Sequence, residues 1–328
     1  MRTCQTDRQH PIPRPLKLTA DKYIPFLRGL AEQYAATDYL APEEISNACI
    51  KDSDALIIRT RTRVGRELLD GTKVRFVATA TIGHDHIDTG WCEQHGICWT
   101  ACPGCNSQAV CDYVEEALNM LHEDGLRAES LGIAGLGNVG SKVKQMAERR
   151  GMKVIVSDPP KGIYGDLTKA DIITFHTPLT KEGEHRTFHL CDAAFLSRCK
   201  DNAVIINAAR GGVVDEEALL KSGRKCIIDC WENEPDINRE LLASRNTVAA
   251  SYHIAGYSLE GKINATMMCM EAFRKFFSLP ALTDEEKRLP LQTEERGDSS
   301  AGWLRRVTEA LKARPADFEK LRKQYRFR

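Results

Sequence analysis

The stretch Ser130-Leu-Gly-Ile-Ala-Gly-Leu-Gly-Asn-Val-Gly140 decides the fold. A short apolar run, typical of a buried strand, leads directly into Gly-x-Gly-x-x-Gly, and a helical pattern covers residues 139–150. Gly135 permits the tight turn, Gly137 lets a pyrophosphate approach the backbone, and Gly140 lets the helix pack on its strand. Free N–H groups at the helix N-terminus can then bind phosphate oxygens. We therefore expect cofactor contacts from Gly135, Gly137, Asn138, Val139 and Gly140.

An acidic residue at the end of the next strand supports this interpretation. Lys153-Val-Ile-Val-Ser157 reads as a strand, and Asp158 closes it. An acid at this spacing binds the ribose hydroxyls of a dinucleotide. Because a carboxylate repels a 2′-phosphate, the sequence predicts NAD rather than NADP as the cofactor.

Three polar residues follow later strand-like runs in the same half of the chain. Arg210, Glu234 and His253 end the stretches that begin at Ala203, Cys226 and Val248. In an open α/β sheet, ligands bind outside the carboxyl ends of the strands. A guanidinium can hold a carboxylate through two hydrogen bonds, and an imidazole can accept a proton near neutral pH. We therefore predict that Arg210, Glu234 and His253 form a catalytic group that removes a proton and a hydride from a hydroxy acid.

Composition limits the class of protein. The chain has 328 residues, of which 42% are hydrophobic, and its formal net charge is zero. This length suggests about two domains, and the charge balance argues against a broad nucleic-acid surface. No apolar run approaches the roughly 20 residues of a membrane span. Residues 1–15 lack the apolar region of a secretory signal, and they read as a loose extended tail.

Strands alternate with helical stretches in both halves, which predicts parallel sheets covered on both faces. The first half contains the expected strands 16–20, 54–59, 74–79 and 96–100. Further helices are expected at 24–34, 108–123, 261–277, 303–312 and 315–325, with a linker at 297–300. We expect the helix at 261–277 to return to the first half. The last two helices are too short for a core of their own and should pack on another surface, such as a second subunit.

Two clusters raise the possibility of bound metal. Cys98-x3-Cys102-x2-Cys105 imitates the cysteine loop of an iron–sulfur enzyme, although Pro103-Gly104 interrupts it. His84-Asp-His86 has two imidazoles but no third ligand in a clear position. We favour buried reduced thiols for most of the 12 cysteines and a packed loop for the histidines, with no metal site.

At these residues the chain resembles the D-2-hydroxyacid dehydrogenase family from about residue 16 onward. The segments that carry the resemblance are residues 55–62, 76–88, 101–106, 135–140, 157–160, 170–178, 231–235, 253–261 and 318–325. The resemblance implies an α/β protein with two doubly wound parallel-sheet domains, a flavodoxin-like substrate domain and a Rossmann NAD domain. It implies a substrate domain at 1–107, to which residues 265–280 return, an NAD domain at 108–264, and a C-terminal dimerisation segment at 281–328 of a cytoplasmic homodimer.

The resemblance also implies a reaction and further site residues. Some of the matching segments are typical of one subfamily, which oxidises 4-phosphoerythronate to 3-hydroxy-2-oxo-4-phosphobutanoate with NAD in vitamin B6 cofactor synthesis. Carried over by motif, Arg210 and Glu234 would be catalytic and His253 would carry the proton. Substrate would contact Thr60, Thr81 and Tyr257, and NAD would contact Asp158, Thr177, Asp229 and Gly256. For the substrate phosphate we expect Arg59, with Arg61, Arg63 and, across a dimer, Arg322 as further candidates.

The chain departs from the family pattern in several places. Residues 160–171 leave about ten residues for a crossover, near the minimum for parallel strands, and the helix region within 210–229 is also short. Tyr252 replaces a proline before His253, and the C-terminal segment ends early, at Arg328. Two alternatives therefore stay open. One is a dehydrogenase for another small hydroxy acid such as 3-phosphoglycerate, and the other is an NAD(H)-sensing binding protein.

Overall fold

The computed structural model describes residues 15–283, 300 and 302–326. The predicted tail at 1–15 and the predicted linker at 297–300 therefore lie almost wholly outside the described residues. Contacts divide the chain into two compact units, residues 1–106 with 259–295 and residues 107–258 with 296–328. Within the described part, no helix has the length and apolar character needed to cross a membrane.

The first unit is built on a five-stranded sheet in which every neighbouring pair is parallel. Its strands are β1 (Lys17–Asp21), β2 (Ala36–Leu40), β3 (Ala55–Ile58), β4 (Phe76–Thr79) and β5 (Cys98–Thr100), in the order β2-β1-β3-β4-β5. Strands β3 and β4 are buried at every position, as expected for a parallel sheet that is covered on both faces. This 2-1-3-4-5 order is that of flavodoxin-like sheets.

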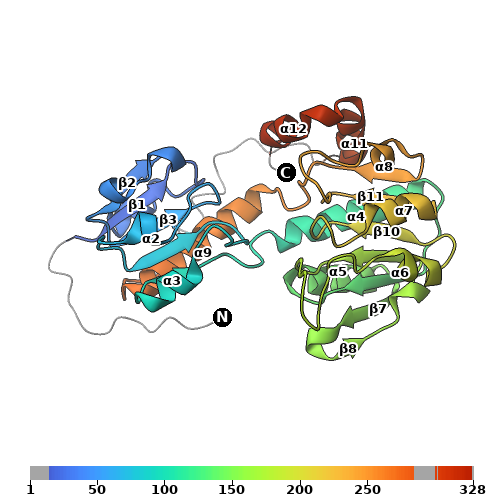
Figure 1. Ribbon diagram of the computed structural model, residues 1–328, viewed down its shortest axis with the longest axis horizontal. Helices are drawn as coiled ribbons and strands as arrows, with labels where there is room; N and C mark the ends of the chain where they lie inside the picture. The colour runs from blue at the N-terminus through green and yellow to red at the C-terminus, as the bar shows by residue number, and fades with distance from the viewer. Residues whose placement is uncertain (1–14, 284–299, 301, 327–328) are drawn as a thin grey trace. The chain divides into compact units, whose positions relative to one another are not determined.

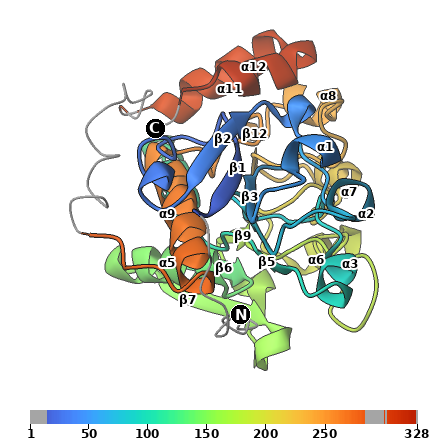
Figure 2. The same cartoon turned by 90° about the vertical axis from the view of Figure 1, so that its left-hand side faces the viewer.

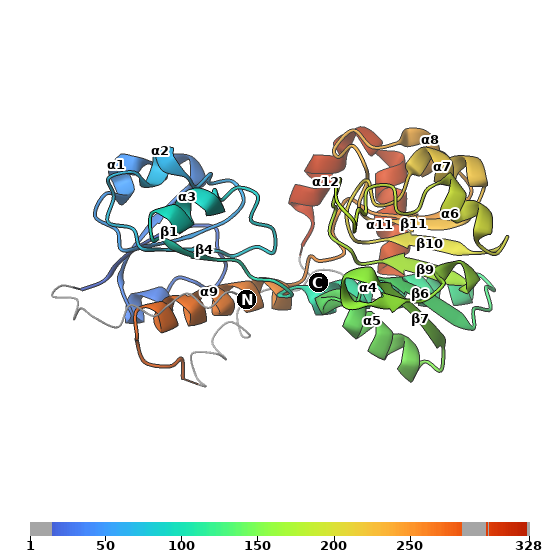
Figure 3. The same ribbon diagram turned by 60° about the horizontal axis from the view of Figure 1, so that its bottom comes forward.

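Helices cover both faces of this first sheet. The short helices α1 (Asn47–Ile50), α2 (Arg66–Leu69) and α3 (Thr89–Gln94) lie on one side and α9 (Leu259–Phe276) on the other (Figures 2 and 3). Phe76 of β4 packs edge-on against Phe273 of α9, with ring centroids 6.2 Å apart. The expected return of the helix near 261–277 to the first half is therefore seen in the packing of α9 on β4.

The helix expected at 24–34 is absent from this described stretch. Residues 24–30 form turns, and only the 3-10 helix η1 (Ala31–Gln33) follows. Phe26 has φ +60° and Gly29 has φ +89°, and both values lie outside the right-handed helical region. The periodic apolar residues Ile24, Leu27 and Leu30 are nevertheless buried, so the pattern identified a packed face but the wrong backbone.

The second unit contains a seven-stranded sheet in the order β12-β11-β10-β9-β6-β7-β8. Its strands are β6 (Ser130–Ala134), β7 (Lys153–Asp158), β8 (Ile163–Tyr164), β9 (Ile172–Phe175), β10 (Val204–Asn207), β11 (Cys226–Ile228) and β12 (Thr247–Ala250). All neighbours are parallel except β7 and β8. The short crossover between β7 and β9 thus contains the edge strand β8 (Figure 1) and the 3-10 helices η3 (Pro159–Lys161) and η4 (Leu167–Lys169), in place of an α-helix.

Two groups of helices flank the strands of the second unit. Helix α5 (Asn138–Arg149) lies on one side, and α6 (Ala193–Arg198), α7 (Glu216–Ser222) and α8 (Arg239–Ala243) lie on the other (Figure 2). Helix α4 (Ser107–Glu123) packs against α5, and α8 packs against α7. The fold is therefore an α/β fold with a doubly wound sheet in each unit. Helix α7 shows that the shortened region within 210–229 still forms a helix.

The C-terminal helices pack within the same chain. Helices α11 (Trp303–Ala313) and α12 (Phe318–Gln324), joined by η6 (Pro315–Asp317), extend the second unit beyond β12 (Figure 1). Thr308 accepts the Ala250 N–H at 3.0 Å, and Lys312 donates to the Thr247 carbonyl at 2.9 Å. The surface that these helices cover is thus the edge of their own sheet, whereas a second subunit was expected. A dimer contact through them remains a proposal.

The packing at the glycine turn gives a first prediction. A Cβ at position 140 would lie 1.9 Å from the Gly135 carbonyl oxygen, whereas a Cβ at position 137 would meet no atom within 4 Å. Gly140→Ala should lower the free energy of unfolding by at least about 1–3 kcal/mol, because the helix must move off its strand. Gly137→Ala is the matched control and should change stability by less than about 1 kcal/mol. Denaturant titration checks both, and equal losses would contradict the close-packing role of Gly140.

Candidate active site

Three adjacent strands carry the predicted catalytic residues. Arg210 follows β10, Glu234 follows β11 and His253 follows β12, and these strands are neighbours in the sheet. Because they are parallel, their carboxyl ends lie at one edge. The structure therefore places all three residues at the edge where an open α/β sheet binds its ligands.

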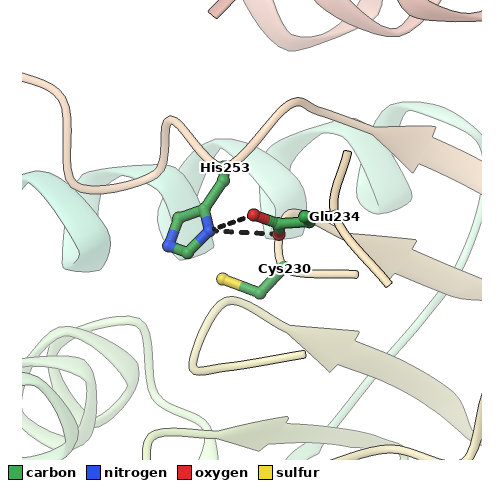
Figure 4. Close-up of side chains that lie close together, drawn as sticks. All are labelled: Cys230, Glu234 and His253. Atoms are coloured by element: carbon green, nitrogen blue, oxygen red, sulfur yellow. Dashed lines mark hydrogen bonds and ion pairs between the residues drawn. The ribbon is translucent and has the colours of Figure 1, made fainter. Parts of the chain in front are cut away.

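Glu234 and His253 are in direct contact. The Nδ1 atom of His253 lies 2.8 Å from Oε2 and 3.0 Å from Oε1 of Glu234 (Figure 4). The same carboxylate accepts the backbone N–H of Trp231 at 2.9 Å, which fixes its orientation. A carboxylate at Nδ1 selects the tautomer that carries its proton there, and it leaves Nε2 free to accept another. Nε2 points away from Glu234 in Figure 4.

The backbone at His253 is held in an uncommon conformation. Its φ is +59°, in the left-handed region that few residues other than glycine adopt. Such a conformation costs of order 1–3 kcal/mol and persists only where surrounding contacts impose it. At His253 these contacts begin with a hydrogen bond of 2.9 Å from its own N–H to the Asp229 carbonyl.

The side chain of Asp229 supplies the remaining restraints. It is 1% exposed and accepts the N–H groups of Ile254 at 2.7 Å and Ala255 at 3.0 Å, together with the Ser251 hydroxyl at 2.7 Å. These bonds fix the residues on both sides of His253. They give Asp229 a positioning role that the sequence did not reveal, and its predicted contact with NAD remains a proposal.

A buried polar network extends this anchor into the core. The Ser251 hydroxyl lies 2.8 Å from the Tyr113 hydroxyl of α4, and the Trp231 indole donates to the Ser251 carbonyl at 2.9 Å. Tyr113 and Trp231 are among the largest fully buried side chains. Two aromatic residues thus connect the His253 loop to the packed interior.

A thiol also lies beside the imidazole. The Cys230 sulfur comes close to both Glu234 and His253 (Figure 4), and burial raises the pKa of Cys230 to about 11. For His253, the charge of a Cys230 thiolate and then Glu234 would raise the imidazole pKa well above its ordinary value, against the opposing effect of burial. Because burial keeps the Cys230 thiol protonated near neutral pH, the Glu234 carboxylate at 2.8 Å is the charge that favours the imidazolium. The imidazolium form is therefore favoured in the folded protein. Sequence analysis missed Cys230, although its place two residues after β11 was a signal.

Arg210 is exposed at the end of β10. Its Nη1 donates to the Ala209 carbonyl at 2.8 Å, and its own carbonyl accepts a hydrogen bond of 3.0 Å from Asn207. The neighbouring Gly211 approaches the chain so closely that a Cβ there would lie 1.8 Å from the Trp231 carbonyl oxygen. The backbone of Arg210 is thus fixed, while its exposed guanidinium has further N–H groups for a ligand.

Arg322 of α12 reaches the site within the same chain. Its Nη1 lies 3.7 Å from Oε2 of Glu234 and 3.2 Å from Oε1 of Glu319. The expected contribution of this residue across a dimer remains a prediction, and within its own chain Arg322 lies beside Glu234. Nearby, the Tyr257 ring lies 6.5 Å from the Tyr325 ring, measured between centroids. The predicted substrate residue Tyr257 is therefore beside the C-terminal helix.

The glycine turn has the form that a dinucleotide requires. Gly135 has φ +88°, and a Cβ there would lie 2.8 Å from the His176 carbonyl oxygen. At Gly137 the space around a Cβ position is open, and Asn138 and Val139 begin α5. A closed turn with one open glycine at a helix N-terminus fits a pyrophosphate.

Residues around this turn also fit NAD. Asp158 ends β7, and its Oδ2 accepts the Leu136 N–H at 2.8 Å and lies 3.4 Å from Lys161 Nζ, its ion-pair partner. After β9, the Thr177 hydroxyl is buried without a hydrogen-bond partner in the described part of the chain. An unpaired buried hydroxyl is unusual in proteins. A ligand group at this position would satisfy it. Gly256 is half-buried beyond the His253 loop.

The predicted substrate residues of the first unit have defined surroundings there. Arg59 donates to the fully buried Asp21 carboxylate from Nε at 2.8 Å and from Nη2 at 3.2 Å. Thr81 donates to the Gly83 carbonyl at 2.9 Å, and Thr60 is exposed. Because a bidentate ion pair with a buried acid already engages Arg59, Arg61 and Arg63 of the same loop are the exposed cations.

The two clusters that raised the possibility of metal have protein partners. The Cys102 thiol donates to the Thr79 carbonyl at 3.3 Å and lies 3.5 Å from the Cys269 sulfur of α9. The His84 ring lies tilted against the Trp99 ring, with centroids 4.9 Å apart, and the His86 Nε2 lies 3.0 Å from the Thr79 hydroxyl. Cys102, His84 and His86 are thus packed within the first unit, and the expected absence of a metal at these two clusters remains a prediction.

Comparison with known proteins defines the class first. Residues 112–255 match the model of the D-isomer specific 2-hydroxyacid dehydrogenase, NAD binding domain. The D-lactate dehydrogenase of Aquifex aeolicus, solved with NAD and lactic acid, has a TM-score of 0.62 at 24% identity over 80% of this chain and 95% of its own. The structure of the TT0316 protein of Thermus thermophilus has a TM-score of 0.66 at 22% identity, over 80% of this chain and 98% of its own. The second unit is thus the NAD-binding domain of a 2-hydroxyacid dehydrogenase.

Curated relatives narrow the class to one family. The erythronate-4-phosphate dehydrogenase of Bacteroides fragilis is 43% identical over 95% of this chain and 97% of its own length. The protein of the same name from Klebsiella pneumoniae is 41% identical over 84% of this chain and 77% of its own. The chain belongs to the erythronate-4-phosphate dehydrogenase family.

The Asp229 anchor yields a prediction about stability. Asp229→Ala leaves two buried N–H groups and one hydroxyl without their acceptor, at about 1–3 kcal/mol each. We expect a loss of at least about 3 kcal/mol in the free energy of unfolding, and a smaller loss for Asp229→Asn, which keeps one acceptor oxygen. The exposed Asp201 provides the matched control, where alanine should cost less than about 0.5 kcal/mol. Chemical denaturation measures all three, and a loss at Asp229 no larger than that at Asp201 would contradict the anchoring role.

Proposed function

We propose that this protein oxidises 4-phospho-D-erythronate to 3-hydroxy-2-oxo-4-phosphooxybutanoate with NAD, a step of pyridoxal 5′-phosphate synthesis. The observation that carries the proposal is the Glu234–His253 pair at the strand edge, 2.8 Å apart, in a chain that is 43% identical to an erythronate-4-phosphate dehydrogenase. A carboxylate-oriented imidazole is suited to general-base catalysis.

His253 would take the hydroxyl proton. When the C2–H bond of the substrate breaks, the C–O single bond becomes a carbonyl and the O–H proton passes to Nε2. Glu234, bonded to Nδ1, stabilises the imidazolium that results. In the reverse direction the same imidazolium returns the proton to the carbonyl oxygen.

Arg210 would bind the substrate carboxylate. A guanidinium donates two parallel hydrogen bonds to a carboxylate, and Arg210 is exposed at the end of β10, the strand beside β11. Such a clamp would orient the single hydrogen of C2 for transfer as hydride. Bound NAD supplies the hydride acceptor, and its pyrophosphate would rest at Gly137 and the start of α5. Asp158 would bind its ribose, and Thr177, Asp229 and Gly256 would make further contacts.

The substrate phosphate would be bound by cations of the first unit. Thr60, Thr81 and Tyr257 are proposed to contact the substrate, as the family resemblance implies. Arg59 is held by Asp21, so we assign the phosphate mainly to Arg61 and Arg63, with Arg59 shaping the loop. Homodimer formation and a cytoplasmic location are proposed on the same resemblance.

Two alternatives can be separated by one assay. NADH formation is followed with 4-phosphoerythronate, 3-phosphoglycerate and D-lactate in parallel. The proposal expects the highest kcat/KM with 4-phosphoerythronate. A higher kcat/KM with 3-phosphoglycerate would indicate a dehydrogenase for another hydroxy acid. NADH binding without turnover of any of the three substrates would indicate an NAD(H)-sensing binding protein.

Removal of the imidazole is the direct test of the catalytic assignment. His253→Ala should lower kcat by about 10²–10⁴-fold, because no group remains to accept the proton, while NADH binding stays near the wild-type value. His185, an exposed histidine of the same unit, is the matched control, and His185→Ala should retain full activity. Turnover by His253→Ala at the wild-type rate would refute the role of this ring.

The pH dependence follows from the raised pKa of His253. Oxidation needs the neutral imidazole, so kcat/KM should rise with pH through a midpoint above the ordinary value of 6.5. Glu234→Gln removes the neighbouring negative charge, so the midpoint should move to lower pH and the maximal rate should fall. Rates of NADH formation across the pH range measure both effects. A midpoint unchanged in Glu234→Gln would show that the carboxylate does not act on the imidazole.

A further inference from the structure

Cys230, Glu234 and His253 bring three metal-binding atom types together. A thiol sulfur, a carboxylate oxygen and an imidazole nitrogen all lie within 4.8 Å of one another (Figure 4). Catalytic zinc sites use three protein ligands of these types and keep a fourth position for water. The proposed dehydrogenase reaction uses His253 and Glu234 but gives the thiol no role.

We propose that Cys230, Glu234 and His253 form an inhibitory site for Zn²⁺ or a similarly soft divalent metal ion. This inference concerns regulation of the same site, so its inhibition arm rests on the proposed function.

The Glu234 carboxylate and the His253 imidazole already lie at nearly the separation of two ligands on one zinc ion. The Nδ1 atom of His253 lies 2.8 Å from Glu234 Oε2, and two ligand atoms on a tetrahedral zinc at about 2.0–2.1 Å are about 3.3 Å apart. A metal between them requires an outward shift of a few tenths of an ångström. Sulfur binds zinc at about 2.3 Å. The Cys230 Sγ lies within 4.8 Å of the other two ligand atoms, and its present hydrogen bond to Asp229 Oδ2 is long, at 3.7 Å.

The surroundings also hold the ligands in place. Glu234 is oriented by the Trp231 N–H at 2.9 Å, and Cys230 follows Asp229, whose carboxylate is fixed by three hydrogen bonds. Supporting contacts of this kind strengthen metal binding. Cys230 is 1% exposed, so the ion would approach from the side of His253 and Glu234, whose side chains are 33% and 17% exposed.

Occupancy of this site would stop proton transfer through a tautomer change. The metal forms bonds to Sγ and Nδ1, the S–H bond breaks, and that proton is released to solvent. The ring proton leaves Nδ1 and resides on Nε2. Nε2 then carries a proton and has no lone pair with which to accept the substrate hydroxyl proton. The same atoms that select the active tautomer would thus, with a metal between them, impose the inactive one.

One nearby charge opposes the ion. Arg322 Nη1 lies 3.7 Å from Glu234 Oε2. The positive charge of Arg322 would therefore repel a metal ion bound to the same carboxylate. Zn²⁺ should consequently bind more tightly when this charge is removed, as in Arg322→Gln.

The inhibition test uses the full chain with 4-phosphoerythronate and NAD. Each variant is compared with its own rate without metal. We expect Zn²⁺ to inhibit the wild type, EDTA to restore the rate, and Mg²⁺, which prefers oxygen ligands, to have no effect. Cys230→Ser and Cys230→Ala should raise the half-inhibitory zinc concentration at least about tenfold. Cys226→Ala, which removes another buried thiol from β11, should leave it unchanged.

A spectroscopic arm does not depend on turnover. Co²⁺ bound to a thiolate gives an intense near-ultraviolet charge-transfer band, which should appear in the wild type and in Cys226→Ala and be lost in Cys230→Ala. Equal zinc sensitivity in all variants, or a cobalt band that survives without Cys230, overturns the proposal. A Cys230-dependent band in a protein that oxidises no hydroxy acid would keep the metal site and refute the proposed function.

Discussion

The geometry of the site depends on one buried carboxylate. Asp229 sits at the end of β11, out of solvent, and it binds the backbone on the C-terminal side of His253 and the Ser251 hydroxyl before it. These bonds hold the positive φ of His253, and that conformation directs the imidazole toward Glu234. Without the Asp229 carboxylate, the backbone of His253 would relax to negative φ, and the imidazole would lose its hydrogen bond to Glu234. The position of His253 beside Glu234 therefore depends on the buried hydrogen bonds of Asp229 as well as on the hydrogen bond between the two side chains.

The sequence predicted the second unit well because each motif there has a local physical cause. Gly135 and Gly140 stand where a Cβ atom would clash with a neighbouring carbonyl oxygen. Because the motif requires glycine at these two positions, the sequence alone predicts the turn. Arg210, Glu234 and His253 follow apolar runs that became adjacent parallel strands, so their placement at one edge required only the rule that parallel strands end together.

The failures of prediction are nonlocal. The run from Ile24 to Leu30 has helical periodicity, yet Phe26 and Gly29 have positive φ values, which apolar spacing cannot reveal. The last helices were expected to pack on another surface, such as a second subunit, and the sequence did not identify the β12 edge, which they contact through Thr308 and Lys312. Cys230 and Arg322 reach the site only after β11 and α12 take their places. Each of these outcomes depends on contacts between residues that are distant in the chain.

The first unit is assembled from two separated pieces of the sequence. Phe76 of β4 packs against Phe273 and Phe276 of α9, and the cluster around them also takes in Ala265, Cys269 and Met270. During synthesis on the ribosome, the five strands emerge well before α9, and all seven strands of the second unit are translated in between. Part of one face of the first sheet therefore stays without its apolar cover during that interval, which gives chaperones a defined surface to protect. The order of folding is thus set by topology, since the second unit can close its sheet while the first still waits for its last helix.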